Sequence, residues 1–225
     1  MFDDAWSQVI SWDHALLRKI NGEWTAPWAD QWFSLSADFG LLFWPFALLL
    51  ALLLIFGRFR ERLFLLLLTA CLLIGDAGLN STIKREVNRP RPYQALDNVR
   101  HVKQGRPFEV RVELSRAAPV ERGRSMTSGH VCNNVAVGVL LTVIYWPWGL
   151  LIWPWVLSMS YARIYTGDHF PTDVIASWAL ALTYASLICC AAQWLWRRCG
   201  PRFMPQTHAA HPSLFPAFTR KAGRN

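Results

Sequence analysis

Long apolar runs with almost no charge constrain this chain more than any other feature of its sequence. Residues 40–56 contain no charged side chain, and residues 63–83 contain only Asp76. Further largely apolar runs follow at 131–146, 149–164 and 174–196. Each run is near the length that a helix needs to cross about 30 Å of hydrocarbon. The sequence therefore predicts an all-α polytopic membrane helix bundle with about five spans, contained in residues 40–196.

Residues 1–39 are too polar to span a membrane, although apolar side chains recur among the charged ones. Trp6, Val9 and Leu17 are examples, and further tryptophans follow at 24, 28 and 32. This pattern is typical of amphipathic helices that lie in the membrane interface. The opening Met-Phe-Asp-Asp lacks the basic start and short apolar core of a cleavable signal. We expect residues 1–39 to form an interfacial segment.

The formal net charge of +8 indicates a membrane role better than nucleic-acid binding, because the basic residues cluster beside the spans. Arginines stand at 58, 60 and 62 after the first span and at 197, 198 and 202 after the last. The positive-inside rule makes this side cytoplasmic, so residues 197–225 would form a cytoplasmic basic tail. The loop 84–124 would then lie outside; it is also basic, but long loops weigh less in this rule. These features predict an integral membrane protein of the bacterial inner membrane.

A polar loop, residues 85–127, separates the second and third spans. Apolar and charged residues alternate in it from Phe108 to Leu114, and this period of two favours a strand. His101 and Val102 could supply the partner strand of a β-hairpin over the active site. A solvated loop without strands is the alternative.

The densest polar cluster lies between the last two apolar runs. His169 and Asp173 are four residues apart, so they share a face if a helix begins near Pro171. A carboxylate behind an imidazole holds one tautomer and raises its nucleophilicity. Arg163 adds a fixed cation upstream. A His-Asp pair that merely caps a helix is the structural alternative.

Two other polar clusters stand at span ends on the same predicted membrane face. Lys84 and Arg91 belong to a cation-rich stretch that ends in Arg-Pro-Arg-Pro. The prolines restrict the backbone φ angle and so present the arginine side chains in set directions. Ser128, Gly129 and His130 open the third span, where a helix N-terminus rich in free amides is suited to an anion. The shared face allows the fold to bring all three clusters together.

In these three clusters the sequence resembles the type 2 phosphatidic acid phosphatase family of membrane lipid phosphatases, which shares its site with vanadium haloperoxidases. The motifs of that family are Lys, six residues, Arg-Pro; then Pro-Ser-Gly-His; then Ser-Arg, five residues, His, three residues, Asp. They correspond here to Lys84 with Arg91-Pro92, to Thr127-Ser128-Gly129-His130, and to Ala162-Arg163 with His169 and Asp173. Thr127 replaces a proline and Ala162 a serine, and neither position contacts phosphate in the family.

The resemblance implies a role for each site residue. His169 would attack phosphorus and form a phosphohistidine, Asp173 would orient it, and His130 would protonate the leaving oxygen. The groups expected to surround the phosphate oxygens are Lys84, Arg91, Arg163, the Ser128 hydroxyl and the Gly129 amide. With three cations present, the resemblance implies no metal and no cofactor.

The sequence therefore predicts a phosphatase that acts on a lipid phosphate or diphosphate at the outer membrane surface. A polyprenyl diphosphate, a lipid A-like phosphate and a glycerophospholipid phosphate all remain candidate substrates. A lipid phosphotransferase using the same site is an alternative. A non-enzymatic lipid-phosphate binder or transporter is a third possibility, but binding alone would not need His130, His169 and Asp173. The abundant spans argue against a haloperoxidase, and no obligate protein partner and no nucleic acid are expected.

Overall fold

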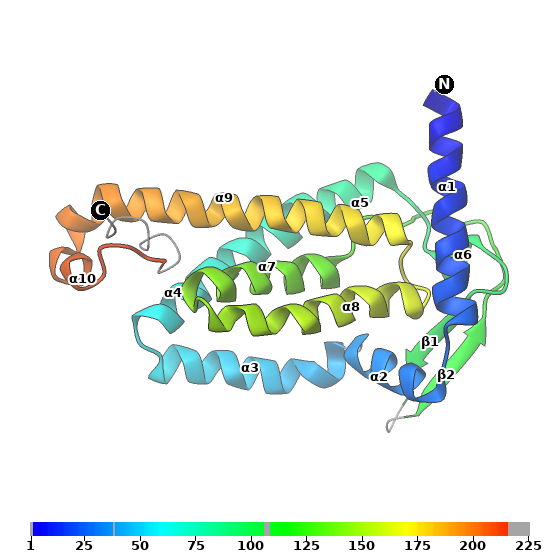
Figure 1. The fold of residues 1–225 in the computed structure, drawn as a ribbon, viewed down its shortest axis with the longest axis horizontal. Coiled ribbons are helices and arrows are strands. Elements are labelled where there is room, and N and C mark those ends of the chain that lie inside the picture. Colours follow the sequence, from blue (N-terminus) through cyan, green and yellow to red (C-terminus); the bar gives the residue numbers. More distant parts are fainter. Residues whose placement is uncertain (1, 38, 106–108, 216–225) are drawn as a thin grey trace.

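The computed structural model describes residues 2–37, 39–105 and 109–215 of the chain. It is a bundle of long helices with a two-stranded sheet and one transverse helix at the same end (Figure 1). The bundle helices are α3 (Phe39–Phe56), α4 (Phe59–Ala70) with η2 (Cys71–Asn80) and α5 (Ser81–Val87), α7 (Gly129–Ile144), α8 (Trp153–Tyr165) and α9 (Pro171–Phe203). Shorter helical segments are η1 (Lys19–Glu23), α2 (Pro27–Ala37), α6 (Pro92–Ala95), η3 (Trp148–Ile152) and α10 (Pro205–Ala210).

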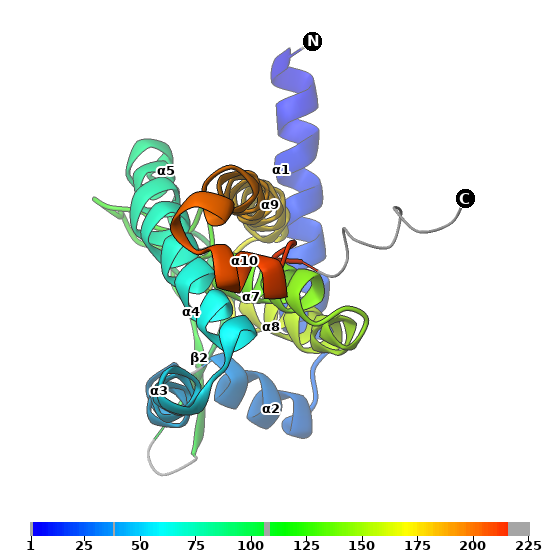
Figure 2. The same cartoon turned by 90° about the vertical axis from the view of Figure 1, so that its left-hand side faces the viewer.

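Helix α7 lies at the centre of the bundle, where it packs against α9, α8, α4 and η2 (Figure 2). Val131, Val135 and Leu140 on this helix are fully buried, because apolar side chains surround it on several sides. Small residues allow close packing of the neighbouring helices. A Cβ added at Gly75 would lie 2.4 Å from the ring of Tyr184, so only glycine admits this aromatic side chain between η2 and α9.

Helices occupy all five predicted apolar runs, but they differ in length. Two helical runs, Phe59–Ala95 and Pro171–Phe203, are long and apolar enough by length and composition to cross a membrane. Phe43–Phe56 and Gly129–Ile144 are shorter apolar helices. The fourth predicted span is divided between η3 and α8, since Pro154 stands in the first turn of α8. The number of five spans therefore stays a prediction.

The alternating part of the polar loop forms strand β2 (Val110–Leu114), which pairs antiparallel with β1 (Arg100–Gln104). His101 lies opposite Glu113 in this register, and Val102 lies opposite Val112. Phe108, which the alternation includes, lies outside the described residues. The Val102 N–H donates to the Thr166 carbonyl at 3.2 Å, so β1 lies directly beside the loop that carries His169.

Helix α1 (Phe2–Arg18) stands across the end of the bundle, roughly perpendicular to α7, α8 and α9 (Figure 1). It is amphipathic, as the sequence predicts: Trp6 and Trp12 are exposed, whereas Leu17 is fully buried. One polar side chain breaks the pattern, because Asp13 is buried on the face that meets the bundle.

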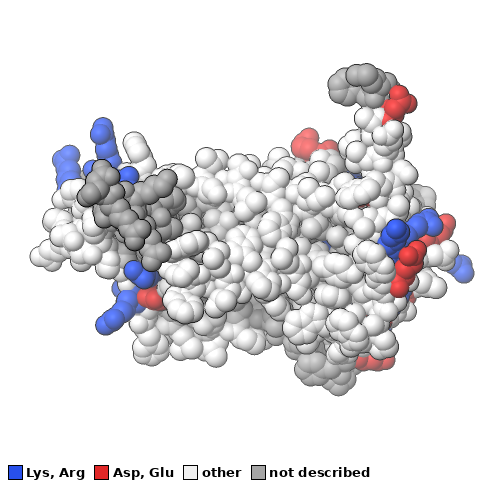
Figure 3. Space-filling model, viewed as in Figure 1, with Lys and Arg blue, Asp and Glu red and all other residues white. Residues whose placement is uncertain are grey.

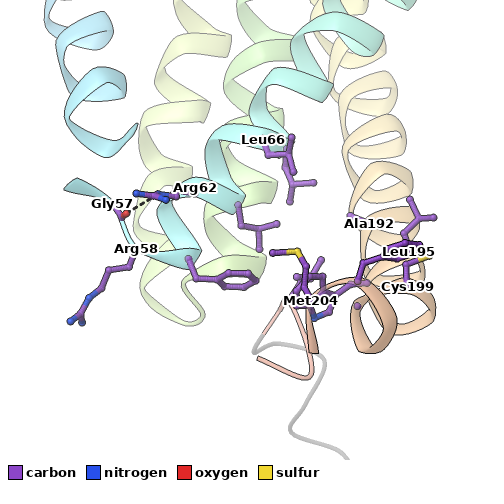
Figure 4. A pocket seen from close by; sticks show the side chains of 15 residues that line it. Gly57, Arg58, Arg62, Leu66, Ala192, Leu195, Cys199 and Met204 are labelled. Atoms are coloured by element: carbon purple, nitrogen blue, oxygen red, sulfur yellow. Dashed lines mark hydrogen bonds between the residues drawn. The ribbon is translucent and has the colours of Figure 1, made fainter. Parts of the chain in front are cut away.

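The residues after 196, expected to form a tail, begin as the last turns of α9. The chain then turns back, and the Gln193 side-chain oxygen accepts hydrogen bonds from the Ser213 hydroxyl and the Leu214 N–H. Between this segment and α4 lies an apolar cavity of about 790 Å³. Met204 points into it, whereas Arg58 at its rim points away (Figure 4). The cavity lies at the end of the bundle opposite to α1 and the strands.

Candidate active site

The fold brings the three polar clusters to one end of the bundle. Their residues lie near the ends of elements that meet beside α1 and the strands (Figure 1). Lys84 is on α5, Arg91 directly precedes α6, Ser128 is the N-cap of α7, Gly129 and His130 begin α7, Arg163 is in the last turn of α8, His169 is in the following loop, and Asp173 is in the first turn of α9.

A tight loop presents His169 between α8 and α9. Gly167 makes the loop possible with φ +76°, and a Cβ there would lie 2.8 Å from the Arg100 carbonyl oxygen. Helix α9 begins at Pro171, where a missing N–H costs nothing. The Asp173 carboxylate reaches back to accept the Phe170 N–H at 2.9 Å, which caps the helix and fixes the residue next to His169.

The imidazole of His169 is held in one tautomer by the main chain. Its Nδ1 lies 2.7 Å from the backbone carbonyl oxygen of Ser125, which can only accept, so Nδ1 carries the hydrogen. The lone pair is therefore on Nε2. Burial, followed by the positive charge of Arg163, lowers the pKa of His169 well below its usual value. At neutral pH the ring is thus an uncharged base with a free nucleophilic nitrogen.

Asp173 does not bind His169 directly. Its Oδ2 is 3.9 Å from Nδ1, too far for a hydrogen bond. Instead, Oδ2 accepts the Ser125 hydroxyl as well as the Phe170 N–H. Asp173 is therefore connected to His169 through Ser125, whose hydroxyl binds the carboxylate and whose carbonyl holds the imidazole. The other oxygen, Oδ1, accepts a hydrogen bond of 2.7 Å from Arg89.

A carboxylate that the sequence analysis missed, Asp168, ties two of the expected phosphate-binding cations together. Its Oδ1 lies 3.2 Å from Arg91 Nη1, and its Oδ2 lies 2.9 Å from Arg163 Nη2. His101 of β1 lies 3.7 Å from Oδ1, and the Thr166 hydroxyl donates to Oδ2 at 2.8 Å. Burial alone would raise the pKa of Asp168, but the positive charge of Arg163, the hydrogen bond from His101 and the other cations nearby together hold this pKa far below its usual value.

Two buried polar groups in the site have no hydrogen-bond partner among the described residues. They are the Ser128 hydroxyl and the Nε–H of Arg163. Buried polar groups are nearly always paired, so these two are free to bind an anion. The Ser128 backbone N–H is already committed, because it donates to the Ser177 hydroxyl at 2.8 Å.

At Gly129, helix α7 lies close to the Lys84 ammonium group on α5. A Cβ added there would lie 3.0 Å from Asp76 Oδ1 and 3.5 Å from Lys84 Nζ. Asp76 also accepts hydrogen bonds from Asn80 at 2.6 Å and Asn133 at 3.2 Å. Asp76, the one charged residue inside the second apolar run, thus contacts the first turns of α7.

His130 shares its charged surroundings with His169. The charges of Arg163, Asp168 and Arg91 act on both imidazoles, and Lys84 acts on His130 as well. Its backbone is fixed by Asn134, which donates from Nδ2 to the His130 carbonyl at 2.9 Å. Two histidines in one field of cations can act as a nucleophile and a general acid.

Sequence reasoning missed four residues of this arrangement: Asp168, Ser125, Arg89 and Asp13. Asp168 and Ser125 lie within the polar stretches that contain the motifs, so their position there is a signal. Arg89 belongs to the Arg-Pro-Arg-Pro stretch, but no local pattern indicates that it pairs with Asp13 and Asp173. Asp13 gave no signal, because its partners are more than 70 residues away. In the described part of the chain, no three His, Cys, Asp or Glu side chains are grouped as metal ligands would be.

Comparisons with known proteins identify the family of the chain. An undecaprenyl-diphosphatase of Sulfolobus acidocaldarius is 42% identical over 77 residues, which are 33% of this chain and 37% of that protein. This chain therefore matches just over a third of that relative's length. The crystal structure of Aquifex aeolicus LpxE has a similar fold, with a TM-score of 0.54 and 22% identity over 77% of this chain and 92% of that one. The sequence profile of the PAP2 superfamily matches residues 62–197, which include every expected site residue, and the chain belongs to this superfamily.

Proposed function

We propose that this protein is an integral-membrane enzyme that hydrolyses a lipid phosphate or diphosphate through a phosphohistidine at His169. One observation carries the proposal: His169 is buried with Nδ1 fixed on the Ser125 carbonyl, which leaves Nε2 as the nucleophile. Arg163, beside it, has an unpaired buried Nε–H that can hold a phosphate oxygen. Membership of the PAP2 superfamily supports the same reaction class.

In the first step, His169 Nε2 attacks phosphorus while the bond to the leaving oxygen breaks. His130, which takes up a proton when the negative charge of the phosphate enters the site, gives that proton to the oxygen as it departs. The new N–P bond makes the imidazole cationic, and the carboxylate of Asp173, 3.9 Å from Nδ1, stabilises that charge. Ser125 keeps the ring aligned throughout.

In the second step, water attacks the phosphohistidine and gives its proton to His130. The N–P bond breaks, the electron pair returns to Nε2, and inorganic phosphate leaves. Phosphoryl transfer demands mainly that charge be held in place. Lys84, Arg91 and Arg163 would supply this positive charge, together with the Ser128 hydroxyl and the Gly129 N–H.

The distribution of side chains supports a membrane position. Charged residues gather toward the two ends of the visible face and are nearly absent between them (Figure 3). On α3, large apolar side chains such as Trp44 and Phe56 are exposed, which suits a surface covered by lipid tails. We propose that about five helices span the bilayer, with the site on the outer face of a bacterial inner membrane. Helix α1 would then lie flat in the interface.

The matched relative suggests an order among the candidate substrates. The matched relative from Sulfolobus acidocaldarius is named an undecaprenyl-diphosphatase. We therefore place polyprenyl diphosphates first among the candidates, ahead of lipid A-like and glycerophospholipid phosphates.

The test is phosphate release by the purified protein in detergent from one lipid of each class. We expect release from at least one lipid and none from a His169→Ala variant. Products are analysed with a second lipid or sugar present, because transfer to that acceptor without free phosphate would favour a phosphotransferase. Binding of every lipid without turnover would contradict the enzymatic proposal.

A further inference from the structure

The side chain of Asp13, on helix α1, contacts the site although it is far from the three motifs in the sequence. Its side chain is buried, and both carboxylate oxygens are bonded to residues of other elements. Oδ1 accepts the backbone N–H of Thr172 at 2.9 Å, and Oδ2 accepts the Thr172 hydroxyl at 2.7 Å. Asp13 therefore caps the N-terminus of α9, the helix whose first turn carries Asp173.

The same carboxylate pairs with Arg89, which also pairs with Asp173. Arg89 Nη2 lies 2.6 Å from Asp13 Oδ2, and Arg89 Nη1 lies 2.7 Å from Asp173 Oδ1. Arg89 also donates to the Thr172 hydroxyl at 2.8 Å. One guanidinium thus stands between two buried carboxylates, one from α1 and one from the first turn of α9.

The charged network of Asp13, Arg89 and Asp173 affects the reactivity of His169. An Arg89–Asp173 pair alone would be neutral and would offer little charge stabilisation to an imidazolium. With the carboxylate of Asp13 included, the network carries one net negative charge. Its nearest member to the imidazole is Asp173 Oδ2, 3.9 Å from His169 Nδ1. In a buried network such charges act strongly, because little water screens them.

Helix α1 also fixes the residue that follows His169. The ring of His14 stacks on Phe170 with centroids 5.4 Å apart and planes at 28°. The guanidinium of Arg89 lies 4.0 Å from the centroid of the same ring. Phe170 is therefore held by two groups, one of which is on α1, and its backbone N–H is bonded to Asp173.

We propose that Asp13 is a positioning residue of the active site, which acts through Arg89 on Asp173 and makes α1 part of the catalytic apparatus. The inference rests on the proposed function, since it needs His169 to carry the phosphoryl group. Asp13 does not touch the substrate. It keeps Arg89 from neutralising Asp173 and holds the first turn of α9 in place.

The test is Asp13→Asn, which keeps the size and one acceptor of the side chain but removes its charge. We expect kcat to fall about 10- to 100-fold, the range seen when a group that orients a reacting residue is lost, with KM changed less than about twofold. The unfolding temperature of each variant in detergent is measured alongside. A merely structural role would lower that temperature without this separation of kcat from KM. Asp4→Asn, which removes an exposed carboxylate from the same helix, is the matched control and should match the parent.

Two further variants keep the outcome decisive. Arg89→Gln and the double variant Asp13→Asn/Arg89→Gln complete a cycle, in which the effects on kcat should be strongly non-additive because both act through Asp173. If Asp13→Asn does not fold, Asp13→Glu is measured in its place; it keeps the charge and should retain most of the kcat. A parent that releases phosphate while Asp13→Asn keeps full kcat overturns this inference alone. A parent that releases no phosphate from any lipid overturns the proposed function, and this inference with it.

Discussion

The imidazole of His169 donates its Nδ1 hydrogen to the backbone carbonyl of Ser125, 2.7 Å away, and not to Asp173, which lies 3.9 Å away. The carboxylate instead accepts the hydroxyl of the same serine. A single residue thus couples the acidic group to the nucleophile through its side chain and its main chain. Because a main-chain carbonyl survives any substitution at 125, the tautomer of His169 should be robust.

We expect His169→Ala to abolish turnover while leaving the bundle folded, because no other described side chain can supply the bond to phosphorus at that position. Phosphate release and the unfolding temperature are compared between the parent and the purified variant. Activity above a few per cent of the parent value would contradict the covalent mechanism.

Asp168→Asn should weaken substrate binding more than it slows chemistry. The buried carboxylate offsets the repulsion between Arg91 and Arg163 and orients both guanidinium groups, whereas an amide keeps one acceptor and loses the charge. We expect KM to rise about tenfold, equivalent to ~1.4 kcal/mol of lost binding, with a smaller change in kcat. Glu121→Gln, which changes an exposed carboxylate in the segment between β2 and α7, is the control. A lower KM in Asp168→Asn would show that the carboxylate competes with phosphate instead of positioning its ligands.

Activity should be insensitive to chelators, because the proposed site holds phosphate with Lys84, Arg91 and Arg163. Phosphate release is measured before and after incubation with EDTA and again after adding Mg²⁺. Loss of activity with EDTA and its recovery with Mg²⁺ would show that a metal ion takes part.

The proposed orientation can be tested in intact cells with single introduced cysteines. A cysteine at Asp97, in the loop between α6 and β1, should react with a membrane-impermeant thiol reagent. A cysteine at Phe59, at the opposite end of the bundle, should not react until the cells are opened. Background labelling is set by the parent, which already contains five cysteines. The reverse pattern would place the site in the cytoplasm.

Much of this architecture could be predicted from local patterns in the sequence. Uncharged apolar runs indicate the bundle helices, and the alternation around Val110 and Val112 indicates β2. The three motifs indicate which helix ends meet. These signals work because each depends on residues that are close in the sequence or on a fixed spacing.

The contacts that tune the site could not be predicted in this way. Asp13 and Thr172 are 159 residues apart, and nothing in the amphipathic pattern of α1 distinguishes Asp13 from the acidic residues facing solvent. The distance from Asp173 to His169 also depends on how Ser125 enters between them from another segment. Such contacts arise only once the tertiary fold has formed.

Leaving-group chemistry provides a test of His130 that also separates substrate classes. A lipid alkoxide is a poor leaving group, so cleavage of a monoester should depend strongly on a proton from His130. A lipid monophosphate leaving from a diphosphate is a much weaker base and needs less help. His130→Ala should therefore reduce kcat/KM for a lipid monoester more than for a lipid diphosphate. General-acid assistance is worth roughly 100- to 10,000-fold, so the contrast should be measurable.

The matched comparison is His169→Ala, which should affect both lipids alike because attack on phosphorus is common to them. The measurement is kcat/KM for both lipids with both variants and the parent. Equal losses of kcat/KM in His130→Ala would mean that this residue does not protonate the leaving oxygen, because hydrolysis of the phosphohistidine follows release of the lipid and affects only kcat. A burst of released lipid before the steady state shows separately whether hydrolysis of the phosphohistidine limits kcat, because the burst occurs only when this second step is slow.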